Sequence, residues 1–240
     1  MAIVFSLVIP TYNEATSIGK VCQEIVSVLD KVPYDFEIIV VDDNSPDGTW
    51  KIVEDLAKQN SKIKLLRRMQ ERGLGSAVVS GWKVAQGEIL GVLDGDLQHP
   101  PEVLEEMIRQ ISNHQEIDIV VASRYIAGGK ILDKNPWRIL KSRLAIFLGS
   151  VLIPGIFRLV KDSMSGYFVL RRKVIEGKPL APIGYKILLE VLAVGNYRKV
   201  YELPYTFALR AGGRTKCSWK QQVISLIHFI RLAGIKNGNF

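Results

Sequence analysis

Residues 89–98 read Ile-Leu-Gly-Val-Leu-Asp-Gly-Asp-Leu-Gln, an apolar run that passes directly into two aspartates and a glutamine. Side chains alternate along an extended segment, so Asp94, Asp96 and Gln98 are expected to point the same way. Their oxygens suit one hard divalent cation, which completes its shell with water and substrate phosphates. The alternative is a surface turn whose aspartates bond only local amides. Taken with its neighbours below, the stretch predicts a metal-held nucleotide diphosphate.

Outward from this stretch, short apolar strands alternate with helical patterns through residues 1–125. Apolar side chains at helical spacing, such as Ile18, Val21 and Ile25, separate the strands. This alternation predicts an α/β fold with a mostly parallel, Rossmann-like central sheet flanked by helices. The predicted strands are Phe5–Pro10, Glu37–Val41, Ile63–Arg67, Ile89–Leu93 and Ile117–Ala122.

Polar loops follow these strands, and ligands bind beyond the carboxyl ends of strands in an open α/β sheet. Residues 10–14 include Tyr12, an aromatic side chain that is able to lie against a base. The alternative for this loop is a helix start, with Asn13 or Thr16 as the capping residue. Residues 72–75 hold two glycines but lack the third glycine of the dinucleotide-binding fingerprint and the lysine of a P-loop, so we interpret them as structural.

A second acidic pair, Asp42 and Asp43, ends another strand on the same predicted edge. Such carboxylates accept hydrogen bonds from a ribose or a base in dinucleotide folds. The alternative is an Asx turn before Pro46. His99 follows the first acidic cluster, but the two prolines after it fit a helix start, so we treat it as supporting the metal site or as having no role.

The second half of the chain differs in pattern and in charge. Residues 1–120 hold 11 Lys and Arg against 19 Asp and Glu, whereas residues 121–240 hold 21 against 5. This asymmetry predicts an anionic partner such as nucleic acid, a membrane surface or a phosphorylated substrate. The alternative is a basic surface that only aids solubility. Helices are predicted over 138–153, 183–194 and 219–235, and extended segments over 167–170 and 199–209.

The apolar segments do not predict a membrane span or a signal peptide. The longest uncharged apolar run, Leu144–Phe157, is interrupted by Pro154 and Gly155 and is too short to cross a bilayer. The N-terminus enters directly into a strand pattern with no basic region before it. Two cysteines, Cys22 and Cys217, fit a reduced, cytosolic compartment better than a disulfide.

These motifs together resemble the inverting glycosyltransferases of family 2. The similarity runs over nearly the whole chain, because the motifs occur in family order at residues 9–14, 40–49, 94–102, 123–125, 162–167, 182–186 and 210–216. Within the family, they are similar to those of members that transfer a mannosyl group from GDP-mannose to dolichyl or polyprenyl phosphate. The resemblance implies one glycosyltransferase A-type domain over 1–240, with a nucleotide-binding half (1–125), an acceptor-binding half (126–217) and a C-terminal amphipathic helix (218–240).

The resemblance also implies a role for individual residues of this sequence. The nucleotide side comprises Pro10, Thr11, Tyr12, Glu14, Val41, Asp42, Asp43, Asp94, Gly95, Asp96 and Gln98, with Lys186, Arg210 and Lys216 as donor-side and loop contacts. It implies that a Mg2+ or Mn2+ ion is bound by Asp94, Asp96 and Gln98. It also implies that the acceptor phosphate is bound by Arg124, Arg138 and Ser142. The residues expected to be catalytic are Asp94, Asp96 and Arg124.

A lipid monophosphate acceptor would need no general base, because phosphate monoesters with a second pKa near ~6 are mostly ionised at neutral pH. We therefore expect direct displacement with inversion, in which the protein aligns the reactants and stabilises the leaving diphosphate. Helices 138–153 and 219–235 are candidates for the membrane interface, which predicts a peripheral enzyme on a cytoplasmic membrane face. Ordinary amphipathic helices packed on the domain are the alternative.

Two other functions compete with this expectation. A related transferase that uses a UDP-sugar, carrying glucose or N-acetylglucosamine, or a hydroxyl acceptor would keep the acidic cluster, but a hydroxyl acceptor would require a catalytic carboxylate. A nucleic-acid-binding module is suggested only by the basic half, and it leaves both aspartate clusters unexplained. Nucleic acid is therefore not an expected partner, and the sequence does not indicate a protein partner.

Overall fold

The computed structural model describes residues 4–132, 136–209 and 219–236, apart from the side chains of residues 136–139, 141, 143, 219–222 and 236. Its strands are β1 (Phe5–Thr11), β2 (Phe36–Asp42), β3 (Ile63–Arg67), β4 (Ile89–Val92), β5 (Ile119–Ser123), β6 (Lys130–Ile131), β7 (Phe168–Arg171), β8 (Val200–Pro204) and β9 (Thr206–Phe207). Its helices are α1 (Ile18–Leu29), α2 (Thr49–Gln59), α3 (Leu74–Val84), α4 (Glu102–Asn113), α5 (Pro136–Leu152), α6 (Pro154–Leu159), α7 (Ile187–Val194) and α8 (Trp219–Lys236), with a 3-10 turn η1 (Arg172–Val174).

The main sheet has seven strands in the order β3-β2-β1-β4-β7-β5-β8. All neighbouring pairs are parallel except those of β7, which runs antiparallel to both β4 and β5. The prediction of a mostly parallel sheet is thus confirmed. Because β1, β2, β4 and β5 run the same way, their carboxyl ends lie along one edge. β6 and β9 form a separate two-stranded parallel sheet.

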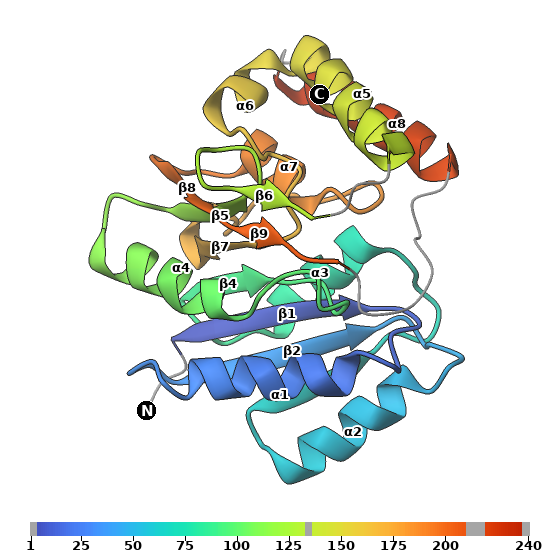
Figure 1. Cartoon of the computed structure of the whole chain (residues 1–240), viewed down its shortest axis with the longest axis vertical. Coiled ribbons are helices and arrows are strands. Elements are labelled where there is room, and N and C mark those ends of the chain that lie inside the picture. The colour runs from blue at the N-terminus through green and yellow to red at the C-terminus, as the bar shows by residue number, and fades with distance from the viewer. Residues whose placement is uncertain (1–3, 133–135, 210–218, 237–240) are drawn as a thin grey trace.

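Helices cover the main sheet, and its central strands are buried throughout. Every residue of β1, β2, β4 and β5 is buried, as expected for parallel strands covered on both faces. α1 packs against α2 and α4, and Figure 1 shows these three helices in front of the sheet. α3 lies on β1 and β2 and comes very close, because a Cβ at Gly81 would be 2.6 Å from Val8 Cγ1. Glycine at this position therefore sets the spacing between α3 and the sheet.

Two predicted elements of the second half are broken by the structure. The predicted extended segment 199–209 changes sheet at Tyr205, whose N–H bonds the Ser123 carbonyl, so that β8 joins the main sheet and β9 joins β6. The predicted helix 183–194 starts only at Ile187, because Gly184 has a φ of +79° in the left-handed region. The sequence patterns overestimated the length of both elements, since neither break leaves a periodic signal.

Three helices of the second half pack together at one end of the molecule. α5 contacts α6 and α8, and Figure 1 shows α5 and α8 side by side at the top of the view. A Cβ at Gly149 would lie 2.2 Å from the Phe157 ring, so glycine is required where α5 meets α6. Phe157 in turn packs edge-on against Phe229 of α8. None of the helices in the described ranges combines the length and apolar character that crossing a bilayer requires.

A buried ionic cluster attaches α8 to α7. The Glu190 carboxylate of α7 lies 2.8 Å from His228 Nε2 and accepts a hydrogen bond of 2.6 Å from Arg231 Nη2, both on α8. The Ala181 N–H donates to the same carboxylate at 3.0 Å. Burial alone would raise the pKa of Glu190, but these bonds outweigh burial and hold the pKa below its ordinary value. The carboxylate therefore stabilises the α7–α8 packing in its ionised form.

The pH dependence of unfolding should follow from Glu190. Because its folded pKa is depressed, its contribution is fully present above the unfolded pKa of about 4.3 and is lost as pH falls through the folded value. Glu190→Gln should therefore lower the free energy of unfolding by about 3 kcal/mol at pH 7, and the difference should shrink at pH 3. Urea unfolding at both pH values measures this. Glu106→Gln, which breaks an exposed pair on α4, should change stability by less than about 1 kcal/mol.

Candidate functional site

The carboxyl edge of the sheet collects the predicted nucleotide-side residues, and two of their carboxylates are already bonded by protein donors. Asp42 is fully buried and accepts bonds from the Ser45 N–H at 2.8 Å, the Ser45 hydroxyl at 2.6 Å and the Thr11 hydroxyl at 3.0 Å. This matches the Asx-turn interpretation. Asp42 therefore holds the β2 loop in shape, and Val41 and Pro10 are buried beside it within their strands.

Asp43 is the centre of a second buried pair. Its carboxylate accepts a bond of 2.7 Å from Arg68 Nε and another of 2.8 Å from the Gly73 N–H. Arg68 is itself buried, and it also bonds the Ser76 hydroxyl and the Gly73 carbonyl. Asp43 thus ties β2 to the start of α3, and Arg68 is a residue of this edge that sequence reasoning missed. Gly73 thus has the structural role that was predicted for residues 72–75.

The loop after β1 is fixed to the neighbouring loops by polar bonds. The Arg72 guanidinium lies 5.0 Å from the centre of the Tyr12 ring, so Tyr12 borders a cationic side chain. Glu14 is buried and lies next to Ser17, whose hydroxyl donates to the Gly95 carbonyl at 2.8 Å. Neither Asn13 nor Thr16 caps α1, because that helix starts after Ser17. Ser17 instead links the loop to the acidic stretch.

The acidic stretch itself is not extended, which corrects the sequence prediction. β4 ends at Val92, Gly95 and Asp96 lie in a turn, and Leu97 has a φ of +63°. Asp94 and Asp96 are both partly exposed, whereas Gln98 is buried and donates its side-chain amide to the Ala208 carbonyl at 3.1 Å. The Ala208 N–H donates back to the Gln98 carbonyl at 2.9 Å. Gln98 thus anchors the end of β9.

The residues of this turn fit a divalent cation in chemistry and in the space around them. Asp94 and Asp96 supply hard oxygen donors. A Cβ at Gly166 would lie 3.0 Å from Asp94 Oδ2, so glycine leaves room beside this carboxylate. The part of the chain that the structure describes holds no group of three or more His, Cys, Asp or Glu side chains arranged around a metal. A cation here would therefore have Asp94 and Asp96 as its proposed carboxylate ligands, with other oxygen donors completing its shell.

On the other side of β7, Arg124 follows β5 and forms a bidentate pair with Asp162. Its Nε and Nη2 donate to the two carboxylate oxygens at 2.7 Å each, and its backbone N–H also donates to Asp162 at 2.9 Å. Burial alone would lower the pKa of the Arg124 guanidinium, but the bonds to Asp162 outweigh burial and raise it. The hydroxyl groups of Tyr125 and Ser142 are 3.1 Å apart, and the guanidinium carbon of Arg124 lies 5.4 Å from the centre of the Tyr125 ring, so Tyr125 neighbours both Ser142 and Arg124.

Of four further predicted residues, Lys186 has a described side chain. Lys186 precedes α7, with its Nζ 4.4 Å from the centre of the Tyr185 ring. The Gly75 N–H bonds the Gly184 carbonyl at 3.0 Å, which brings this segment to the same edge as Asp43. Arg138 lies in α5, but its side chain is outside the described residues, as are Arg210 and Lys216 altogether.

A cavity of about 390 Å³ opens at the ends of β2 and β3, next to Tyr12. Its cationic and aromatic members are Trp50, Lys51, Arg67 and Arg72, and the guanidinium carbon of Arg67 lies 3.5 Å from the centre of the Trp50 ring. Arg67 also donates to Asn44 Oδ1. The remaining lining residues are Asn44, Ser45, Pro46 and Gly48. Sequence reasoning missed this basic wall, because its members come from three separate segments.

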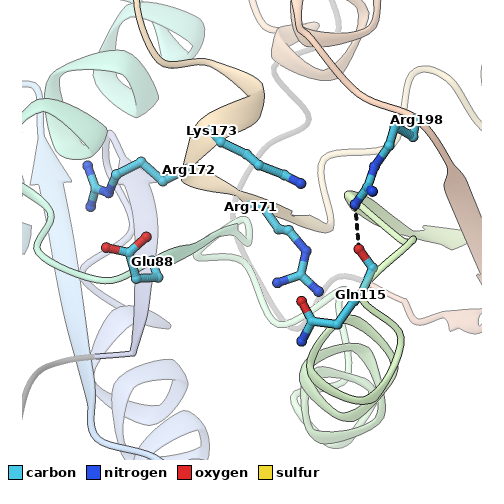
Figure 2. A pocket seen from close by; sticks show the side chains of 6 residues that line it. All are labelled: Glu88, Gln115, Arg171, Arg172, Lys173 and Arg198. Carbon is cyan, nitrogen blue, oxygen red and sulfur yellow. Dashed lines mark hydrogen bonds between the residues drawn. The ribbon is translucent and has the colours of Figure 1, made fainter.

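A second basic pocket, of about 410 Å³, lies at the opposite edge of the sheet (Figure 2). Its guanidinium groups bond backbone carbonyls, because Arg171 donates to Ile117 and Arg172 to Gly87. Arg198 likewise donates to the Gln115 carbonyl. Lys173, Arg198 and, at 3.8 Å, Arg171 also pair with the buried carboxylate of Asp118. These cations bind backbone carbonyls and a buried carboxylate of the protein itself, so part of the positive charge of the second half is structural.

Comparisons with known proteins agree with this geometry. The profile of Glycosyl transferase family 2 matches residues 6–177. The chain is 44% identical over 227 residues to a dolichol-phosphate mannosyltransferase of Pyrococcus furiosus, covering 95% of this chain and 63% of that protein. It therefore spans less than two thirds of that relative. It is 32% identical to a Saccharomyces cerevisiae protein of the same name, covering 92% of this chain and 83% of that one.

The fold is similar to that of solved glycosyltransferases. A glucosyl-3-phosphoglycerate synthase of Mycobacterium tuberculosis, solved with Mn2+, UDP and glucosyl-3-phosphoglycerate, superposes with a TM-score of 0.71 at 20% sequence identity. The superposition covers 98% of this chain and 80% of that one. This similarity identifies the sheet and its flanking helices as a glycosyltransferase A-type fold.

The Asp43–Arg68 pair should be essential for the integrity of this edge. Arg68→Met leaves the Asp43 carboxylate buried without its cation, which should lower the free energy of unfolding by about 3 to 5 kcal/mol. Arg109→Met removes the cation of an exposed α4 pair and should cost less than about 1 kcal/mol. Urea unfolding of both variants compares the two. Equal losses would mean that Asp43 does not depend on Arg68.

Proposed function

Because the chain belongs to glycosyl transferase family 2, we propose that it transfers a mannosyl group from GDP-mannose to dolichyl or another polyprenyl phosphate, with inversion at the anomeric carbon. The relatives named dolichol-phosphate mannosyltransferase support this choice of substrates, since two of them match more than nine tenths of the chain. The donor lies at the ends of β1, β2 and β4, and the acceptor phosphate lies beyond β5.

The observation that carries the proposal is a single loop that contacts both sides of this site. Asp162 in this loop holds Arg124, and Gly166, four residues later, lies against the Asp94 carboxylate. The Ser165 hydroxyl between them donates to the Ala122 carbonyl at 2.8 Å, which fixes the loop to β5. The acidic turn and the arginine are thus held in one arrangement, which a transfer between two phosphate-bearing substrates requires.

The chemistry assigned to the chain is positioning and charge stabilisation. The acceptor phosphate is mostly ionised at neutral pH, so its oxygen attacks the anomeric carbon without a protein base. The bond to the diphosphate breaks as the new bond to the phosphate oxygen forms, which inverts the configuration. Arg124 has five guanidinium N–H groups, and two of them donate to Asp162, which orients the side chain. The remaining N–H groups of Arg124 are the proposed donors to the acceptor phosphate.

The Arg124–Asp162 pair has no net charge, so Arg124 alone does not balance a phosphate. Other cations are needed on the acceptor side, and Arg138 in α5 is the candidate, with Ser142 as a hydroxyl contact. On the donor side we assign Lys186, Arg210 and Lys216 to the leaving diphosphate. Arg67 and Arg72 in the cavity near Tyr12 add positive charge there.

A divalent cation, Mg2+ or Mn2+, is proposed on Asp94 and Asp96. When bound, it would neutralise the charge that develops on the leaving diphosphate. The Gln98 amide nitrogen donates to Ala208 and anchors β9, a bond that does not use its side-chain oxygen. We therefore assign the metal to the two aspartates, with the Gln98 side-chain oxygen as the third proposed ligand.

We also propose that α5 and α8 bind the surface of a membrane peripherally. Large apolar side chains are exposed in a stripe on each helix, comprising Leu140, Leu144, Phe147 and Val151 on α5 and Val223, Ile227 and Ile230 on α8. The spacing of three and four residues puts each set on one helical face. Exposed apolar faces of this kind on adjacent helices are typical of membrane or protein contacts. A lipid acceptor favours the membrane.

The donor and the metal can be tested in one assay. Purified protein is incubated with polyprenyl phosphate and a panel of GDP- and UDP-sugars, with and without Mn2+, and the lipid product is analysed for its anomeric configuration. We expect GDP-mannose to be used with inversion, and Asp96→Ala to lower kcat/KM by at least about 10²-fold. Asp55→Ala, which removes an exposed carboxylate of α2, is the control. A retained configuration, or full activity of Asp96→Ala, would contradict the proposal.

Membrane binding can be tested with a matched pair of variants. Phe147 and Met69 are each 62% exposed, but Met69 lies after β3, away from α5 and α8. Phe147→Asp should weaken sedimentation with anionic liposomes about 10-fold or more, because burying a phenylalanine contributes about 1.5 to 3 kcal/mol. Met69→Asp should leave binding unchanged. Equal binding of the wild type and Phe147→Asp would exclude α5 from the lipid contact.

A further inference from the structure

His99 is enclosed by aromatic rings directly behind the acidic turn. It is only 4% exposed. Its ring centre lies 5.2 Å from that of Tyr167, 5.8 Å from that of Tyr205 and 5.2 Å from that of Phe207. Three rings from three sides leave the imidazole little freedom to turn. The ring is therefore held in one orientation by packing, and the direction in which its nitrogens point is fixed.

Both nitrogens of His99 face polar groups. Nδ1 lies 3.2 Å from the Tyr205 hydroxyl, and Nε2 lies 3.5 Å from Asp94 Oδ2, which is the distance of an ion-pair contact. An ionised carboxylate only accepts, so in a neutral ring the proton belongs on Nε2. Nδ1 then accepts from the Tyr205 hydroxyl, whose pKa is raised by burial and which therefore keeps its proton. Tyr205 thus donates to Nδ1, and the Nε2–H group is on the side of the ring next to Asp94.

Asp94 has two neighbours at one of its oxygens, His99 from the same loop and Gly166 from a segment distant in the sequence. Gly166 lies against the same oxygen, Oδ2, that faces His99. One third of the Asp94 side chain remains exposed. The carboxylate is thus bounded on its inner side and open on its outer side, which is the arrangement of a ligand held for a cation arriving from solvent.

We propose that His99 is a positioning residue that orients the Asp94 carboxylate for a divalent cation, and that Tyr205 fixes the tautomer in which it does so. The inference rests on the proposed assignment of the metal to Asp94 and Asp96. Hydrogen-bond partners of metal ligands contribute to metal affinity, and their loss typically lowers it about 10- to 100-fold. His99 itself touches neither the cation nor the substrates.

The test is Mn2+ binding by the purified full chain, measured by electron paramagnetic resonance of the free ion, with Mn2+ alone and with Mn2+ plus GDP. His99→Phe fills the aromatic box but removes the donor, and it should weaken Mn2+ binding about 10- to 100-fold. His99→Gln restores an N–H near the position of Nε2 and should recover most of the affinity. His99→Asn, whose shorter amide does not reach Asp94, should not recover it. Tyr205→Phe should give a smaller loss than His99→Phe.

Controls distinguish a loss of Asp94 orientation from a loss of folding and from an error in the proposed metal site. Thermal unfolding of each variant shows whether the fold is kept, and His114→Phe, at the exposed end of α4, should leave Mn2+ binding unchanged. If the wild type binds Mn2+ and Asp96→Ala weakens binding, but His99→Phe binds as the wild type does, the inference is wrong while the proposed function stands. Equal losses in His99→Gln and His99→Asn would also overturn it. If the wild type binds no Mn2+ under either condition, the metal assignment fails and the role of His99 fails with it.

Discussion

A carboxylate buried at the edge of a sheet must be hydrogen-bonded, and this requirement shapes the whole candidate site. Asp42, Asp43 and Asp162 are each buried and hydrogen-bonded. The donors to Asp42 are Ser45 and Thr11, those to Asp43 are Arg68 and Gly73, and the donor to Asp162 is Arg124. Leaving any of them without a partner would cost several kcal/mol, about 3 to 5 for a broken buried pair. The loops at this edge are therefore held by their own acidic residues before any substrate arrives.

Within this framework, Asp94 and Asp96 are different because they remain partly exposed. The buried acidic residues hold the loops in place through hydrogen bonds within the protein, whereas Asp94 and Asp96 are accessible to ligands. The same division separates the arginines. Arg68, Arg171 and Arg172 close internal contacts, whereas Arg67 and Arg72 line a cavity beside Tyr12. A count of charges along the sequence does not distinguish these two groups, and so the basic character of the second half overestimates the positive surface available to an anionic partner.

The sequence predicted the first half of the fold well, because strands such as Ile89–Leu93 and the helices between them carry strong periodic signals. It also located the acidic turn, but its expected extended geometry was wrong, since the positive φ of Leu97 is not encoded by any pattern. Pairs such as Arg124 with Asp162 join residues from separate segments, and periodicity does not indicate which distant side chains meet. The surroundings of His99 were not predictable for the same reason, because its aromatic neighbours lie in residues 167–207.

The antiparallel strand β7 has a consequence for how the chain folds. It is inserted between β4 and β5, which precede it in the sequence, so neither of these strands is fully paired until residues 168–171 have been synthesised. A nascent chain that ends before Phe168 leaves one edge of β4 and both edges of β5 open, because β8, the other neighbour of β5, also follows β7 in the sequence. Open edges are sites of aggregation. Long-range pairing of this kind also slows folding. The two sides of the site are therefore brought together late, when β7 pairs with both β4 and β5.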